Sequence, residues 1–234
     1  MRLAFGLLIA VNTSAYASPP ETACTTPNEQ CYCAEGDAPQ TCFVRFKGSA
    51  SIIPDDVWEN INGVSWKPGC PVGREGLRLL SMSHWDANLQ PATGEMVVAA
   101  QHAEVVLAAF EDLYNARFPI AQMKRVDAFE ANDNQSMVAN NTSAFNCRRI
   151  SGTQRWSQHA YGGAIDINPF WNPWVQNERV DPKQAKAFAD RKNLRPGMLT
   201  EDSAAVTAFT SRGWGWGGHW QRSKDYQHVS ATGE

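Results

Sequence analysis

The segment Ser157-Gln-His159-Ala-Tyr-Gly-Gly-Ala-Ile-Asp166 places a histidine and an aspartate on either side of two glycines. The glycines permit a tight turn and a close backbone approach. After them, residues 164–168 alternate small or apolar side chains with polar ones, which predicts a short strand that ends at Pro169. We therefore expect His159 on a loop and Asp166 on the returning strand, with both side chains facing one point.

A second segment, Asp225-Tyr-Gln-His228, adds another histidine and another carboxylate. These two residues are close enough in sequence to project together from a tight turn or from the start of a strand. Two neutral imidazoles and one carboxylate suit zinc, and three protein ligands leave a fourth position for water. The two segments predict one open zinc site per chain, together with a carboxylate that can act as a general base.

The two segments together resemble the zinc D-Ala-D-Ala carboxypeptidase / L-Ala-D-Glu endopeptidase family, the peptidoglycan peptidases that include vancomycin-resistance dipeptidases and phage endolysins. The resemblance covers about residues 80–230. It implies that the metal ligands are His159, Asp166 and His228. It also implies that Asp225 is the general base, which takes a proton from water and passes it to the leaving amine.

The segment Asn140-Asn-Thr-Ser-Ala-Phe-Asn-Cys-Arg148 also resembles this family. By this resemblance, Arg148 is the cation that polarises the scissile carbonyl. The adjacent Arg149 is an alternative, and in a strand the two side chains would point to opposite faces, so only one of them can serve. The candidates for substrate binding are Ser157, Trp216 and Arg149. The sequence departs from the family after the last ligand, where Val229-Ser230 replaces the common Phe-Glu and removes any contact that the glutamate makes.

The N-terminus is typical of a secretory signal, because an apolar run, Leu3–Val11, precedes the small residues of Ala15-Tyr16-Ala17. We expect residues 1–17 to be a signal peptide and the product to be secreted without a membrane anchor, since the apolar run is too short to span a bilayer. All six cysteines follow this segment. Disulfide bonds are expected in an oxidising compartment. Six cysteines allow fifteen connectivities, and the sequence does not choose among them. Cys147 is interpreted as a structural cysteine rather than as a catalytic thiol, and a bridge from it to the N-terminal part would tie the two parts together.

The length of 234 residues accommodates one good-sized domain and a small addition. Residues 18–79 are predicted to form a loop-rich, Cys-rich segment that disulfides stabilise, and residues 80–234 to form the zinc peptidase domain. The formal net charge of −3, without a basic run, argues against nucleic acid as a partner. We expect a monomer that binds peptidoglycan stem peptides.

Apolar residues recur at three- and four-residue spacing over residues 95–117, which predicts a helix. Alternation predicts a strand at Met123–Glu130, and a capping signal at Thr200 predicts a second helix to about Ser211. With the strands that carry the ligands, these elements predict an α+β fold. Helices would cover one face of a small antiparallel sheet that holds a single zinc, which is also the fold that the resemblance implies.

The resemblance implies hydrolysis of either a terminal D-Ala-D-Ala bond or an internal L-Ala-D-Glu bond. Aspartate rather than glutamate at Asp225 favours the endopeptidase. A carboxypeptidase must also bind a free carboxylate, for which Arg149, Arg155 or Ser157 are candidates. The alternative function is a non-catalytic zinc-containing domain that binds the cell wall or another ligand, because hedgehog signalling domains resemble this fold and zinc site. The presence of both Asp225 and Arg148 favours catalysis.

Overall fold

The computed structural model describes residues 31–33 and 42–234 of the chain. The short strands β1 (Cys31–Cys33) and β2 (Cys42–Val44) pair in a two-stranded sheet. The predicted signal peptide lies outside the described residues. Among the residues that are described, no helix has the length and apolar character needed for a membrane span.

The chain divides into two compact units, with the boundary between Phe43 and Val44. Residues 44–79 therefore belong to the same unit as the residues that follow them. Within this unit a disulfide joins Cys70 to Cys147, which are 77 positions apart. The expected bridge from Cys147 to the lead-in is thus present, while the predicted domain division after residue 79 stays a prediction.

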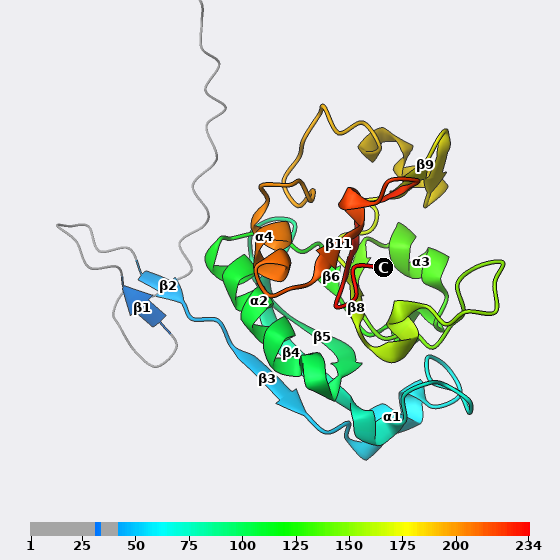
Figure 1. Cartoon of the computed structure of the whole chain (residues 1–234). Coiled ribbons are helices and arrows are strands. Elements are labelled where there is room, and N and C mark those ends of the chain that lie inside the picture. Colours follow the sequence, from blue (N-terminus) through cyan, green and yellow to red (C-terminus); the bar gives the residue numbers. More distant parts are fainter. Residues whose placement is uncertain (1–30, 34–41) are drawn as a thin grey trace, which may run out of the picture. The chain divides into compact units, whose positions relative to one another are not determined.

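The larger sheet of this unit has the order β3-β4-β5 and is antiparallel throughout. Its strands are β3 (Gly48–Ser51), β4 (Leu77–Trp85) and β5 (Pro91–Ala99). Helix α2 (Ala103–Asn115) packs against β3 and β4, and α4 (Ala204–Thr210) lies beside α2 (Figure 1). The apolar core forms between these layers, and its largest fully buried side chains include Leu80, Met82, Met96, Phe110, Leu113 and Phe209.

A smaller antiparallel sheet has the order β11-β13-β8. Its strands are β11 (Gly215–Trp216), β13 (His228–Ser230) and β8 (Ala164–Asp166). In the register of β13 and β8, His228 lies opposite Asp166. Asp166 from the first sequence motif and His228 from the second therefore lie on neighbouring, paired strands.

A third antiparallel sheet, of order β10-β9-β12, positions the remaining carboxylate. Its strands are β9 (Trp174–Gln176), β10 (Arg179–Asp181) and β12 (Lys224–Asp225). Asp225 lies opposite Trp174 in this sheet. A fold of mixed helices and small antiparallel sheets is thus confirmed.

The other elements are short. One strand pair is parallel, β6 (Gln122–Met123) with β7 (Asn141–Thr142). The remaining α-helices of the described residues are α1 (Asp55–Ile61) and α3 (Asp133–Val138). Short 3-10 helices occur at Arg74–Gly76, Ala100–His102, Val126–Phe129, Gln158–Tyr161, Lys183–Phe188 and Gly217–His219.

The helix predicted over residues 95–117 is wrong in its first part, because β5 runs to Ala99 and α2 begins only at Ala103. Val97 and Val98 pair with β4 instead, as suits β-branched side chains in a buried strand. Gly94 also lies within β5. A Cβ there would lie 2.4 Å from the Cβ of Met123, so this glycine allows close packing.

Two further boundaries differ from those predicted. The strand predicted at Met123–Glu130 is wrong beyond its first residue, since the chain turns into 3-10 helix at Val126–Phe129. The second predicted helix is present as α4 but starts later. Its N-cap is Ser203, whose hydroxyl accepts a hydrogen bond from the backbone N–H of Val206 at 3.3 Å.

Candidate metal centre

The 3-10 helix Gln158–Tyr161 positions His159. Its N-cap is Ser157, whose hydroxyl accepts a hydrogen bond from the His159 backbone N–H at 3.3 Å. The helix ends at Gly162, with a φ of 66°, and a Cβ there would lie 2.4 Å from the backbone nitrogen of Ala99. Glycine suits this left-handed and closely packed position. The tight turn predicted after His159 is therefore present.

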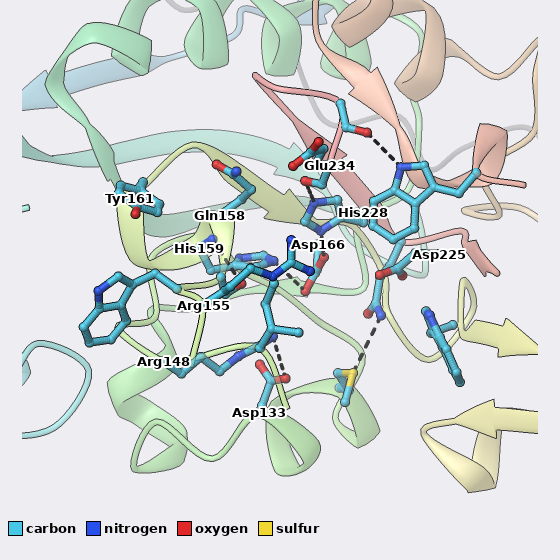
Figure 2. A pocket seen from close by; sticks show the side chains of 18 of the residues that line it. Asp133, Arg148, Arg155, Gln158, His159, Tyr161, Asp166, Asp225, His228 and Glu234 are labelled. Atoms are coloured by element: carbon cyan, nitrogen blue, oxygen red, sulfur yellow. Dashed lines mark hydrogen bonds and ion pairs between the residues drawn. The ribbon is translucent and has the colours of Figure 1, made fainter. Parts of the chain in front are cut away.

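His159, Asp166 and His228 each offer a potential ligand atom, and these atoms lie within 4.8 Å of one another (Figure 2). Nε2 of His159 lies 3.2 Å from Oδ2 of Asp166. Nδ1 of His228 lies 3.1 Å from Oδ1 of the same carboxylate. All three side chains are buried. The fold thus brings the three sequence-predicted ligands into one cluster that could hold a metal ion.

The outward-facing nitrogen of each imidazole is held by a backbone oxygen. Nδ1 of His159 donates a hydrogen bond to the carbonyl oxygen of Ala144 at 2.6 Å, and Nε2 of His228 donates one to the backbone oxygen of Glu234 at 3.1 Å. Because a backbone oxygen can only accept a hydrogen bond, Nδ1 of His159 and Nε2 of His228 each carry a hydrogen. In the neutral rings, the nitrogens that face Asp166 then carry the lone pairs. This donor set fits zinc, whose histidine ligands are oriented by such contacts.

The charges within the cluster shift the pKa values of Asp166 and His228. Burial alone would raise the pKa of the Asp166 carboxyl, but the charges and hydrogen bonds of His159 and His228 hold this pKa well below its usual value. Burial alone would lower the pKa of His228, but its hydrogen bond to Asp166 and the negative charge of that residue raise this pKa. The cluster therefore favours an ionised carboxylate, which is the form that binds a metal.

Asp225 reaches the same site from β12. A Cβ at Gly217 would lie 2.5 Å from the backbone oxygen of Asp225, so the glycine allows this strand to approach. The Oδ1 atom of Asp225 is buried and has no hydrogen-bond partner among the described residues. Burial raises the pKa of its carboxyl to about 6. A carboxyl with a pKa near neutrality, facing a cavity, is suited to proton transfer.

A cavity of approximately 920 Å³ connects these groups, and His159, Asp166, Asp225 and His228 all line it. This volume is in the range of pockets that bind small molecules. The aromatic residues in its lining are Trp156, Tyr161, Trp174 and Trp220. The cavity thus joins a potential metal site and a free carboxylate to aromatic surfaces on which a substrate could pack.

The structure separates the two adjacent arginines. Arg148 lines the cavity, where its Nη2 lies 2.8 Å from Oδ2 of Asp133 and its buried Nε has no hydrogen-bond partner among the described residues. Arg149 does not line this cavity. Its guanidinium lies 4.2 Å from the centre of the Trp156 ring. Of the two arginines, only Arg148 is in a position to contact a ligand in the cavity.

Residues 151–231 match the model of a protein family described as D-alanyl-D-alanine carboxypeptidase. This segment is therefore similar to that peptidase family. The match includes His159, Asp166, Asp225 and His228, whereas Arg148 precedes it. Comparisons with curated proteins and with solved structures found no match.

The other predicted substrate-binding residues differ in where the structure places them. Ser157 lines the cavity, as does Arg155. Trp216 is 5% exposed and packs in the core, where its Nε1 donates a hydrogen bond to the backbone oxygen of Tyr226 at 2.9 Å. Three further histidines lie outside the cavity lining: His84, His102 and His219.

The lining of the cavity also contains polar residues that the two motifs did not identify. Gln158 and Gln227 each directly precede a predicted ligand, so adjacency to the motifs could have identified them. Asp133 and Glu234 also line the cavity. Asp133 lies before the matched segment and outside any motif, and only the fold brings it to the site.

Proposed function

We propose that this protein is a secreted zinc peptidase that hydrolyses a peptide bond in peptidoglycan stem peptides. The observation that carries this proposal is that one cavity holds a buried His-Asp-His cluster together with an oxygen of Asp225 that has no hydrogen-bond partner among the described residues. The family match supports this substrate class. The disulfide between Cys70 and Cys147 supports export, because such bonds persist in oxidising compartments.

In this proposal, His159, Asp166 and His228 hold the zinc ion. Bound zinc supplies Lewis acidity for the attacking water and for the scissile carbonyl. Asp225 accepts a proton from the water and passes it to the leaving amine. Arg148 stabilises the negative charge that develops on the carbonyl oxygen. Its cationic side chain already lines the cavity that the carbonyl would enter.

Two stem-peptide bonds are compatible with the site. Arg155 lines the cavity and supplies a cation for the free carboxylate of a terminal D-Ala-D-Ala unit, and the matched family is described by that activity. Aspartate at Asp225 instead favours the internal L-Ala-D-Glu bond. The proposal covers both bonds, and the products of digestion distinguish them.

The test is digestion of purified peptidoglycan by the zinc-loaded mature protein, with the fragments identified by mass spectrometry. Loss of one terminal alanine indicates a carboxypeptidase, and fragments that start at D-Glu indicate the endopeptidase. The Asp225→Asn variant is expected to lose activity by a factor of roughly a hundred or more while it still binds zinc. A sample treated with a chelator is expected to be inactive.

The matched control is Asp56→Asn, which removes an exposed carboxylate on α1 and is expected to retain activity. If the wild-type protein binds zinc and releases no fragment, the peptidase proposal is wrong, and the non-catalytic binding domain takes its place. If Asp225→Asn is as active as the wild type, the general base is another residue.

A further inference from the structure

Gln227 has a buried side-chain amide whose oxygen, unlike its nitrogen, has no hydrogen-bond partner among the described residues. Only 4% of the residue is exposed, and it lines the cavity of the proposed active site. Its Oε1 has no hydrogen-bond partner among the described residues. Its Nε2 donates to the Sδ atom of Met137 at 3.7 Å, and a thioether is a weak acceptor. Buried polar groups normally form hydrogen bonds, so we expect a bound molecule to donate a hydrogen bond to this oxygen.

The backbone fixes where this amide lies. Gln227 belongs to the two-residue turn between β12 and β13. Its carbonyl oxygen accepts a hydrogen bond from the Ile167 N–H at 2.9 Å, which extends the pairing of β13 with β8. The turn is therefore held on the strand pair that carries Asp166 and His228. The position of the amide in the cavity follows from the same ladder that places these two residues.

The unpartnered atoms at this end of the cavity define the ligand they would accept. The Oε1 of Gln227 and the Oδ1 of Asp225 both lack a partner among the described residues, and both are acceptors when Asp225 is ionised. The two side chains also interact with each other, since Gln227 lowers the pKa of the Asp225 carboxyl. A ligand that satisfies both atoms must present N–H or O–H donors. A peptide offers its backbone N–H groups.

We propose that Gln227 is a substrate-binding residue whose side-chain oxygen accepts a hydrogen bond from the N–H of the scissile peptide bond. This inference rests on the proposed peptidase function, in which Asp225 acts at that same nitrogen. Gln227 then places the scissile nitrogen next to the carboxylate that protonates it. The residue also makes binding depend on an N–H at this position.

The test uses two inhibitors of the zinc-loaded protein that differ in one group. A phosphonamidate carries an N–H at the position of the scissile nitrogen, and its phosphinate isostere carries CH2 there. Both are built on the residue pair whose bond the digestion identifies. Binding is measured by calorimetry, which does not depend on turnover. Wild-type protein is expected to bind the N–H compound about tenfold more tightly, which corresponds to one neutral hydrogen bond.

Gln227→Met keeps the length and the contact with Met137 but removes the acceptor, and it is expected to bind both compounds with nearly equal affinity. Gln227→Leu is a second variant, in case the first folds poorly. Gln158→Met, which removes another cavity glutamine, is the matched control and is expected to retain the tenfold preference. Zinc content and circular dichroism check each variant.

The outcomes separate this inference from the function on which it rests. If wild-type protein digests peptidoglycan but Gln227→Met keeps the full preference for the N–H compound, the role of Gln227 is overturned and the peptidase function stands. The same holds if the wild type shows no preference, or if Gln158→Met abolishes it. If neither compound binds the wild type and no digestion occurs, both proposals are wrong.

Discussion

His228 and Asp166 lie opposite each other in the register of β13 and β8, with Nδ1 of the histidine 3.1 Å from Oδ1 of the aspartate. The second oxygen of Asp166 lies 3.2 Å from Nε2 of His159. One carboxylate therefore contacts both imidazoles, and a strand ladder between residues 62 positions apart sets one of these distances. Because the ladder is buried, it holds these side chains in a cluster that could bind a metal ion.

Replacing Asp166 should abolish metal binding. Asp166→Asn removes the only carboxylate of the three proposed ligands, and we expect zinc affinity to fall by more than about 100-fold, beyond the typical loss from a change outside the first ligand shell. A competition titration with a chromophoric chelator measures this, and Asp56→Asn serves as the control. Unchanged affinity would show that zinc binds elsewhere.

The two adjacent arginines should differ in their effect on catalysis. Arg148→Met removes the cation that lines the cavity, and we expect kcat to fall by a factor of roughly a hundred, as for loss of an oxyanion donor. Arg149→Met removes a guanidinium that stacks on Trp156, and we expect a change of less than about twofold. Steady-state kinetics on the stem-peptide fragment compare them. Equal losses in the two variants would contradict this assignment.

The disulfide between Cys70 and Cys147 should contribute strongly to stability. It closes a separation of 77 positions, and the chain-entropy relation gives roughly 4 kcal/mol for a loop of this size. The double variant Cys70→Ser/Cys147→Ser should therefore unfold at a lower urea concentration than the oxidised wild type. Adding reductant should lower the wild-type midpoint by more than that of the variant. Coincident midpoints in oxidised wild type and variant would rule out a stabilising bond.

His84 should make stability fall in mild acid. Burial lowers the pKa of this histidine below its ordinary value of 6.5, although hydrogen bonds to the backbone oxygens of Trp85 and Ile120 act in the opposite direction. The unfolded state then binds more protons between the two pKa values. Stability contributed by the neutral side chain is present above about pH 6.5 and is lost as the pH falls below it, by up to about 1.4 kcal/mol per pH unit.

Urea unfolding at pH 8 and pH 5.5 measures this dependence. The His84→Gln variant keeps a polar side chain of similar size but does not titrate, so we expect it to lose less stability between the two pH values than the wild type. An equal loss in both proteins would assign the pH dependence to other groups.

Much of the proposed site could be predicted from two short motifs. The spacing around the glycines placed His159 and Asp166 on a turn and its returning strand, and the observed geometry agrees. The ends of the longer helices and strands could not be predicted as well from the sequence. Residues 95–99 fit a helical pattern equally well, and they form a strand because β4 supplies a partner for them.

The cluster of potential metal ligands could be predicted from the sequence because such ligands are a few residue types held at short spacing by local turns. The position of Arg148, and not Arg149, in the cavity lining and the pairing of Cys147 with Cys70 required the tertiary structure. The same is true of the amide oxygen of Gln227, which has no hydrogen-bond partner among the described residues. Which side chain faces a cavity, and which polar atom is left without a partner, depend on packing between segments far apart in the chain. The local sequence pattern does not contain information about that packing.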